Sequence, residues 1–569
     1  MSEPWFEQLP ERLEYELQAL RDVGFTAGVD QEARRRGQLV MSVPCLIEGT
    51  EHVLRVEFPA KYPYFPFQVF APSLSLERHQ DPYLKALCFV ARIESEWRTD
   101  DTLAKYLVEK LPEVLKANKS EGPFDGEGHE GAPVTLYLPF EPQSVVLIGD
   151  WKLPAQATRG TLLLGIEKDR EGQVPFRAAV REIRDERGHL LGELDARVWQ
   201  PFRKELPARW VRLPLRPKSS DLNAILEDVV QRWPATRSPN FHGGALDVTG
   251  IVFPDEVGYR EWQDTWIFLL RRKAGRLPTA GRGRRSAPRQ LLSLVRADRA
   301  GRTDLQARVP RLVPIADQKA AVFGLGALGS MVAWQLARAG LGRLAIIDYD
   351  FVNAATTPRW ILGLSAAGRD KGTVLADHLR QQYPFLTVDP IFYRVGNPYF
   401  DSRAEDAMHR ALDGANVIVD CTVEKTVHHY LSDLAWKRGI PYIWASGTPG
   451  AWGGIVGRIR LDKSRGCWKC FLGHLADGGI REPQAEERPD IQPVGCDVPT
   501  FRGAGFDLDE VALMCARLAA STMCQGAASG YGDFAWDVAV LDLCEQGRPI
   551  APMWTTYELL HHHGCDAHD

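Results

Sequence analysis

Three features of specialised proteins are missing from this 569-residue sequence. No apolar run approaches the roughly 18 residues that cross a bilayer, so the sequence predicts no membrane-spanning helix. The first residues, Met1 to Asp22, are rich in acid and contain no apolar core of a secretion signal. The ten cysteines are too few for a disulfide framework in so long a chain. We therefore expect a cytoplasmic protein whose cysteines pack, bind metal or react.

A strong excess of one charge is missing as well. The net charge is only -5, which disfavours an overall electrostatic role on nucleic acid or an anionic membrane. One segment, residues 271–317, is basic, but no aromatic side chain interleaves with its charges up to Arg311, which weakens a base-stacking role. Glycine, proline and serine interrupt it around Pro278–Pro288, so we predict a solvated tether, with an anion-binding surface as the alternative.

The length predicts three or four domains at roughly 100–200 residues each. In the first domain the patterns predict a helix near Trp5–Arg21, strands at Gln38–Ile47 and His52–Phe58, and a helix near Thr102–Lys116. The expected multidomain α/β order is an α+β domain over 1–117, a linker over 118–132, a mixed α/β adaptor domain over 133–270, the basic tether over 271–317, and a doubly wound, Rossmann-like domain over 318–569.

A glycine-rich turn opens the last domain. Gly324, Gly326 and Gly329 follow an apolar strand and begin a helical pattern, so backbone N–H groups and the helix N-terminus can meet a phosphate. Asp348 ends the next strand, where an acid binds ribose hydroxyls. These residues predict a nucleotide or dinucleotide site without choosing between the two.

Two cations favour a triphosphate. Arg359 and Lys371 lie shortly after Asp348, and a leaving pyrophosphate needs such counter-charges whereas a nicotinamide dinucleotide does not. A surface position for each cation is the simpler alternative.

These motifs resemble the ubiquitin-activating, ThiF and MoeB adenylation superfamily over roughly Gln318 to Asp569. The resemblance implies that Asp348 holds the ribose of ATP, that Arg359 and Lys371 hold its phosphates, and that an acid after the third strand holds Mg²⁺. We predict Asp420 as that ligand, with Glu424 as the alternative, because Val423 stands where the family has a second Asp. Thr356 likewise replaces a family Asn. Adenylating relatives also lead us to expect a homodimer.

Paired cysteines predict a metal site in the same domain. Cys467 and Cys470 have the spacing of half a tetrahedral Zn²⁺ site, and Cys565 with His568 supplies a second pair. The alternative is two unconnected pairs, and the residues His561, His562 and His563 are further candidate ligands.

Two other cysteines have the settings of nucleophiles. Cys496 lies between prolines in an expected loop, where its thiolate could attack a bound adenylate. Cys88 follows the segment Tyr62–Phe67 and precedes Trp97, in an order that resembles ubiquitin-conjugating enzymes. That resemblance implies an acyl-accepting Cys88. The family's His-Pro-Asn element is replaced by His79-Gln80-Asp81, so the route to an isopeptide bond is open.

The whole domain order resembles the bacterial Cap-type fusions of CBASS antiphage systems. The resemblance implies ATP-dependent activation of a C-terminal carboxylate, a thioester on Cys496 and then Cys88, and conjugation to a lysine. The implied substrate is a nucleotidyltransferase or a ubiquitin-like protein with a free C-terminus; no membrane and no nucleic acid is expected as partner. Three alternatives stay open: a non-catalytic nucleotide-binding scaffold, a sulfur-transfer adenylase and an NAD-dependent oxidoreductase.

Overall fold

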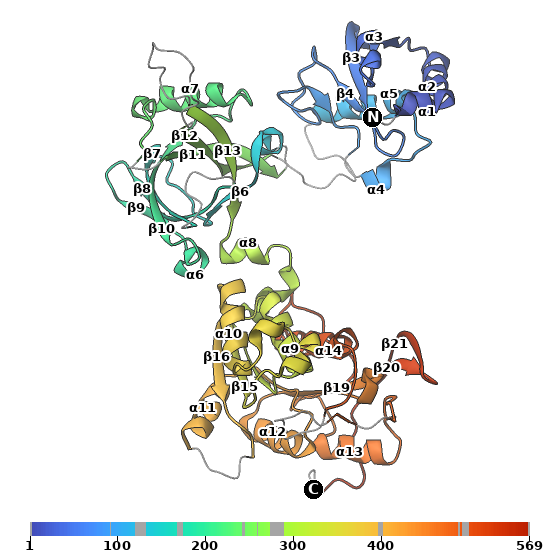
Figure 1. Cartoon of the computed structure of the whole chain (residues 1–569), viewed down its shortest axis with the longest axis vertical. Helices are drawn as coiled ribbons and strands as arrows, with labels where there is room; N and C mark the ends of the chain where they lie inside the picture. Colours follow the sequence, from blue (N-terminus) through green and yellow to red (C-terminus); the bar gives the residue numbers. More distant parts are fainter. Residues whose placement is uncertain are drawn as a thin grey trace. The chain divides into compact units, whose positions relative to one another are not determined.

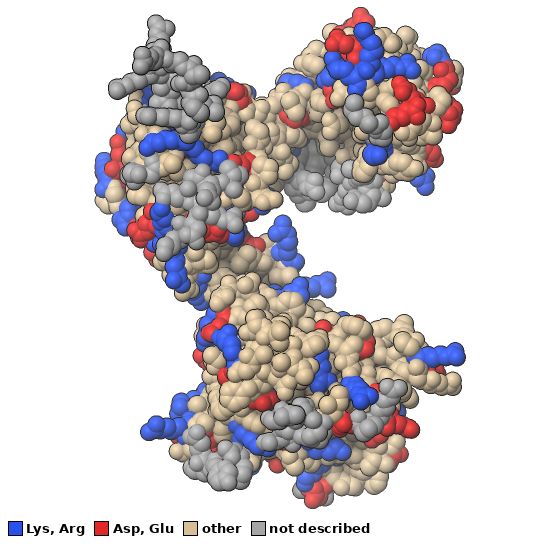
Figure 2. Space-filling view, viewed as in Figure 1, with Lys and Arg blue, Asp and Glu red and all other residues tan. Residues whose placement is uncertain are grey.

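The computed structural model describes residues 3–90, 93–119, 133–167, 175–241, 245–258, 260–273, 290–396, 402–487, 490–491 and 500–566. The chain divides into two compact units, Met1–Gly301 and Arg302–Asp569. Basic and acidic side chains are interspersed over both in Figure 2, as the small net charge leads one to expect. No helix in the described part of the chain is long and apolar enough to cross a membrane.

The first unit begins with an antiparallel sheet covered by helices. Its sheet has the order β1-β2-β3-β4-β5. The strands are β1 (Gly28–Val29), β2 (Leu39–Ile47), β3 (Thr50–Phe58), β4 (Gln68–Phe70) and β5 (Ala86–Leu87). The helices are α1 (Trp5–Gln8), α2 (Pro10–Asp22), α3 (Gln31–Arg35), α4 (Ile93–Glu96) and α5 (Leu103–Lys119). The single helix predicted near Trp5–Arg21 is two helices, because Pro10 has no N–H to continue α1 and instead starts α2.

This first sheet buries one face. Residues of β2 alternate between buried and exposed in its second half, and the buried side chains meet Leu13 and Leu20 of α2 and Leu107 of α5 in one apolar cluster. The Trp97 indole packs in the same core and donates to the Pro63 carbonyl at 2.9 Å. Tyr62, Phe67 and Trp97 of the region that resembles the conjugating enzymes therefore lie in the domain core, whereas Tyr64 and Phe65 are exposed.

The second part of this unit is a β-barrel. Its sheet has the order β6-β13-β12-β11-β10-β7-β8-β9, and a further pairing of β6 with β8 closes the ring. The strands are β6 (Phe140–Ile148), β7 (Arg159–Ile166), β8 (Arg177–Asp185), β9 (Leu190–Glu193), β10 (Lys204–Arg212), β11 (Leu246–Gly258), β12 (Glu261–Lys273) and β13 (Gln290–Arg299). The helical segments are η1 (Val134–Tyr137), α6 (Ala196–Trp199), α7 (Leu222–Arg232) and η2 (Pro234–Thr236).

The barrel differs from the predicted mixed α/β domain and tether. Residues 290–299 of the predicted tether form strand β13, and Arg271 at its start lies in β12. Arg271 is 1% exposed and donates to Asp247 and to the Thr236 carbonyl of η2, both at 2.7 Å, so this basic residue is neutralised between the outer face of the barrel and η2 rather than solvated. Within 300–317, Arg302–Gln306 and Pro310–Asp317 are helical, and residues 274–289 lie outside the described residues.

The second unit is a doubly wound sheet (Figure 1). The strand order is β16-β15-β14-β17-β18-β19-β20-β21, parallel from β16 to β18 and antiparallel beyond. The strands are β14 (Lys319–Phe323), β15 (Arg343–Asp348), β16 (Thr387–Phe392), β17 (Val417–Asp420), β18 (Tyr442–Gly447), β19 (Gly453–Ile459), β20 (Val538–Glu545) and β21 (Arg548–Tyr557). This order confirms the predicted Rossmann-like topology.

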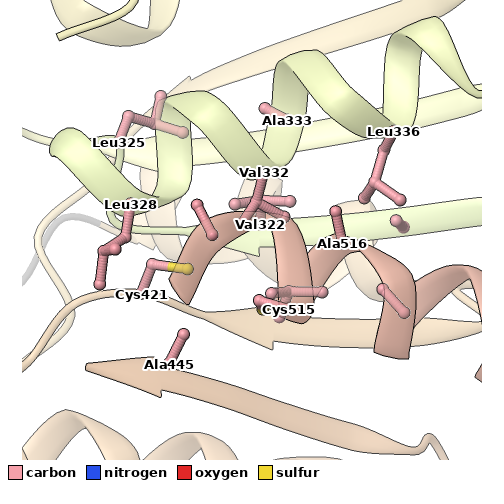
Figure 3. Packing of buried hydrophobic residues seen from close by; sticks show 14 of the residues in the cluster. Val322, Leu325, Leu328, Val332, Ala333, Leu336, Cys421, Ala445, Cys515 and Ala516 are labelled. Atoms are coloured by element: carbon pink, nitrogen blue, oxygen red, sulfur yellow. The ribbon is translucent and has the colours of Figure 1, made fainter. Parts of the chain in front are cut away.

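Helices cover both faces of this sheet. One face carries α9 (Ala327–Arg338), α10 (Lys371–Gln382) and α14 (Gly505–Met523), and the other carries α11 (Ser402–Leu412), α12 (Lys425–Arg438) and α13 (Trp468–Ala476). The shorter segments are α8 (Arg302–Gln306), η3 (Pro310–Asp317), η4 (Ala354–Arg359), η5 (Leu364–Ala366) and η6 (Pro449–Ala451). Figure 3 shows Val332 of α9 and Cys515 of α14, which belong to the same apolar cluster over the strands. The carboxyl ends of β14, β15 and β17 thus form one edge, the usual place for a ligand in such folds.

Candidate functional site

The turn after β14 requires glycine at two of its three motif positions. Gly324 has a φ of +77°, and a Cβ there would lie 2.8 Å from the Thr422 backbone. A Cβ on Gly329 would lie 1.8 Å from the Gly324 carbonyl oxygen. By contrast, a Cβ on Gly326 meets nothing within 4 Å, and Gly326 is the N-cap of α9. Gly324 and Gly329 shape the turn. Gly326 leaves open space at the helix N-terminus, where phosphate binds favourably.

Asp348 fixes this turn from the neighbouring strand. One of its carboxylate oxygens accepts the Leu325 N–H at 2.5 Å, and the other accepts the Asp350 N–H at 2.8 Å. The residue is only 9% exposed. Its carboxylate therefore organises two backbone segments at the carboxyl edge of the sheet, next to the place predicted for ribose.

The two predicted cations lie on the segments that follow. Lys371 begins α10, and its ammonium group donates to the Asp350 carboxylate at 2.6 Å. Arg359 ends η4, donates to the Phe501 carbonyl at 2.6 Å, and places its guanidinium 5.5 Å from the centre of the Phe501 ring. Burial lowers the pKa of Arg359, which shows a partly desolvated cation that lacks a carboxylate in the contacts described. An anionic ligand would supply that missing charge.

The predicted magnesium ligand is enclosed by protein. Asp420 is 0% exposed and its two oxygens accept bonds from Thr422, His428 and Tyr442. A bound cation would have to replace some of these donors, so the role of Asp420 stays a prediction. The alternative ligand is Glu424. Burial raises the pKa of the Tyr349 phenol, and the negative charges of Glu424 and Asp350 raise it further.

A cleft of about 840 Å³ lies at Arg359 and the start of α9, and Asp348, Lys371 and Asp420 are not among the residues that line it. Its walls include Ala327 and Met331 of α9, Arg359 of η4, and Phe501. Ile491 and Thr500 also line it and bond each other's backbones at 2.7 and 2.8 Å. Cys496 lies outside the described residues, but this bridge fixes both flanks of its loop at the cleft.

Comparison with known sequences identifies the domain. Residues 305–527 match the ThiF family. The chain contains a ThiF/MoeB-like adenylation domain. Similar proteins include the uncharacterized protein y4oA of Sinorhizobium fredii, at 29% identity over 99% of this chain and 97% of that protein. The molybdopterin-synthase adenylyltransferase of Salmonella typhimurium is 28% identical over 27% of this chain and 59% of its own.

Two further comparisons each cover 45% of the chain. The ATP-dependent ubiquitin transferase-like protein Cap2 of Enterobacter hormaechei is 24% identical, and the matched region covers 45% of this chain and 47% of Cap2. The crystal structure of Escherichia coli MccB with ATP aligns with 45% of this chain and 68% of its own at 14% identity, with a TM-score of 0.34.

The adenylation domain gathers three of the four predicted zinc ligands. The Cys467 sulfur lies 3.8 Å from that of Cys470 and 3.6 Å from that of Cys565. Tetrahedral zinc with Zn–S bonds of about 2.3 Å places its sulfurs about 3.8 Å apart, so the three thiols fit zinc closely. Bound zinc would be held here by thiolates and would join α13 to the segment after β21. The fourth predicted ligand, His568, lies outside the described residues.

Cys88 lies in the first unit, directly after β5. Its side chain is exposed, and its N–H donates to the His79 carbonyl at 2.8 Å. The intervening loop is ordered by Asp81, one carboxylate oxygen of which accepts the N–H groups of Tyr83 and Leu84 at 2.7 and 2.9 Å. An exposed thiol on a braced loop is suited to carry an acyl group.

Sequence reasoning missed several residues near these sites. Phe351 and Phe392 form an exposed pair with ring centres 5.8 Å apart at the ends of β15 and β16. Phe501 contacts Arg359 from a segment 142 positions away in the sequence. The sequence could have indicated Phe351 and Phe392, because both are aromatic residues at or just after the ends of parallel strands, and such strand ends converge in this fold.

Proposed function

We propose that this protein activates the C-terminal carboxylate of a protein or peptide as an acyl-adenylate and then carries the acyl group on cysteines. ATP with Mg²⁺ binds at the Gly324–Gly329 turn, and the carboxylate attacks the α-phosphate and releases pyrophosphate. The observation that carries this proposal is the glycine turn braced by Asp348 in a ThiF/MoeB-like domain, with Lys371 paired to Asp350 and with Arg359 lining a cleft at the start of α9. Their charges suit a nucleoside triphosphate and a leaving pyrophosphate.

The later steps use the two predicted nucleophiles. Cys496 attacks the acyl-adenylate and expels AMP, and Cys88 then accepts the acyl group by thioester exchange before transfer to a lysine. Support comes from the fixed flanks of the Cys496 loop at the cleft and from the exposed Cys88 on its braced loop. The likeness to Cap2 favours this order and an antiphage setting. A homodimer and a cytoplasmic location remain part of the proposal.

A second candidate, sulfur transfer, is favoured by different relatives. The ThiS adenylyltransferase of Escherichia coli is 27% identical over 27% of this chain, and the Salmonella protein acts in the same chemical class. In that case Cys496 would receive sulfur and Cys88 would carry nothing. The exposed position of Cys88 favours the first candidate.

Pyrophosphate exchange tests the adenylation step. The chain is mixed with ATP, Mg²⁺, labelled pyrophosphate and the protein products of adjacent genes, one at a time. Arg359→Ala and Lys371→Ala should each lower exchange on the order of 10²-fold, because each removes a preorganised counter-charge. Arg343→Ala and Lys437→Ala are the matched controls, since both side chains are exposed and Arg343 lies at the opposite end of β15.

Two results would count against the proposal. Exchange at the normal rate in both Arg359→Ala and Lys371→Ala removes the phosphate assignment. Intact-mass measurement of the same mixtures, repeated with an added persulfide donor, decides between the candidates: an acyl adduct on Cys88 supports conjugation, and replacement of one carboxylate oxygen of the substrate by sulfur supports sulfur transfer.

A further inference from the structure

The loop that carries Cys88 is anchored on the β-barrel of the same unit. The Arg78 guanidinium pairs with the Glu256 carboxylate of β11, and the two side chains are only 14% and 5% exposed. Glu256 also accepts the Arg260 N–H at 2.6 Å, which fixes the acid from the barrel side. Removing one partner of such a pair would leave the other charge buried without compensation, so the contact ties the loop firmly to the barrel.

A second anchor lies further along the same loop. The Tyr83 hydroxyl donates to the Pro217 carbonyl at 2.9 Å. Its ring packs against an apolar cluster that includes Phe253 of β11. Two separate points of the loop therefore contact the barrel, one through charge and one through an aromatic side chain.

The first anchor is connected to Cys88 through a single residue. His79 follows Arg78 and has a φ of +57°, a conformation that is uncommon for residues other than glycine. Its carbonyl accepts the Cys88 N–H at 2.8 Å. A backbone of this kind costs free energy and persists only where its surroundings hold it. The Arg78–Glu256 pair thus holds the segment whose carbonyl fixes the Cys88 backbone, while the Cys88 thiol is exposed.

We propose that Arg78 is a positioning residue for the transfer of an acyl group from Cys88 to an amine, and that the barrel is the support against which it acts. The inference rests on the proposed function of Cys88. In this transfer the amine nitrogen bonds to the acyl carbon and the C–S bond breaks. The Cys88 thiolate leaves and takes up the proton that the amine loses.

Transfer and loading should depend on this support to different extents. Aminolysis of a thioester requires orientation of the acyl group and the amine, and a displacement of about 1 Å can slow such a step on the order of 10²-fold. Loading of an exposed thiolate by a small thioester depends mainly on its ionisation and its access. Loss of Arg78 should therefore slow discharge much more than loading.

The test uses the full-length chain and bypasses adenylation. All variants carry Cys496→Ala, and Cys88 is loaded by exchange with a synthetic glycyl-peptide thioester. Discharge to free lysine is followed by intact mass, and the adduct is assigned by its absence in Cys88→Ala. Arg78→Ala should load within about threefold of the parent and discharge on the order of tenfold more slowly. Arg78→Lys keeps the charge and should recover most of the rate.

Exchange of the two charges tests the pair itself. Arg78→Glu combined with Glu256→Arg should recover part of the discharge rate, and only part because the Arg260 N–H loses its acceptor. Arg78→Ala combined with Glu256→Ala should be no slower than the slower single change, since both remove the same contact. Arg36→Ala and Arg237→Ala are the matched controls, because each removes an arginine of an exposed ion pair, one in each domain, and both should discharge like the parent.

Hydrogen exchange adds a measurement that does not depend on the proposed chemistry. Amides of residues 78–88 should exchange on the order of tenfold faster in Arg78→Ala, because the loop has lost an anchor. Unchanged hydrogen exchange there overturns the inference, as does discharge of Arg78→Ala at the parent rate, or a charge exchange that loads normally and recovers no rate. A parent protein that cannot be loaded overturns the proposed role of Cys88, whereas normal loading with unchanged discharge overturns the positioning role of Arg78 alone.

Discussion

Two substitutions in the glycine turn, Gly329→Ala and Gly326→Ala, each add one methyl group and should fail in different ways. In Gly329→Ala the new Cβ would lie 1.8 Å from the Gly324 carbonyl oxygen, a backbone atom that cannot move without opening the turn. In Gly326→Ala the new Cβ meets nothing within 4 Å and instead enters the space at the α9 N-terminus. The first change should damage the fold, and the second should damage the phosphate site.

The magnitudes follow from these positions. A backbone overlap of this size should lower the free energy of unfolding by about 3 kcal/mol, at the upper end of the usual range for overpacking. For a unit of this size that corresponds to a fall in Tm of roughly 6–12 °C. Gly326→Ala exchanges one N-cap residue for a poorer one and should change stability by about 1 kcal/mol or less, while weakening ATP binding on the order of tenfold.

Calorimetry with and without ATP and Mg²⁺ measures both effects. Wild type should gain Tm on adding ATP, because a ligand that binds only the folded state stabilises it. Gly326→Ala should start near the wild-type Tm and gain less than wild type, by about 1.4 kcal/mol of ligand stabilisation at saturating ATP. If Gly329→Ala keeps the wild-type Tm, or if Gly326→Ala gains as much as wild type, the interpretation of this turn is wrong.

Three further predictions concern the other groups. Cys467→Ser should lower zinc content below about half an equivalent and reduce stability, because structural zinc contributes folding free energy; elemental analysis of the purified protein measures it, and full zinc content would refute the site. Cys496→Ala should form adenylate yet load nothing on Cys88, whereas Cys88→Ala should accumulate a reductant-sensitive adduct on Cys496; normal loading of Cys88 without Cys496 would refute the relay. Asp420→Asn should lower stability by about 2 kcal/mol in urea denaturation, because it disturbs a buried carboxylate that accepts four bonds, while Glu424→Gln should raise the Mg²⁺ concentration needed for exchange if Glu424 is the ligand.

Features formed by residues close together in the sequence were predicted from local sequence patterns. The glycine turn, Asp348 and the alternating strands and helices lie within a short stretch of sequence, and the doubly wound sheet follows from them. The cysteine pairs were found because zinc sites use short, regular spacings on each side. The barrel was missed because its ring closes through β6, which pairs with the distant strand β13 as well as with β8. The enclosure of Asp420 could not be predicted either, since its partners His428 and Tyr442 come from two later elements.

The link between Cys467 and Cys565 has a consequence for synthesis of the protein. The two cysteines are 98 positions apart, and β19 pairs with β20 across a similarly long stretch. While a ribosome makes the chain, the adenylation domain therefore cannot complete its sheet until Tyr557 has emerged, or its cysteine cluster until Cys565 has emerged. The first unit needs no such wait, because its strands end at Arg299. A nascent chain would thus contain a folded Cys88 domain well before the adenylation domain is complete. A product truncated before residue 565 should therefore be inactive in adenylation.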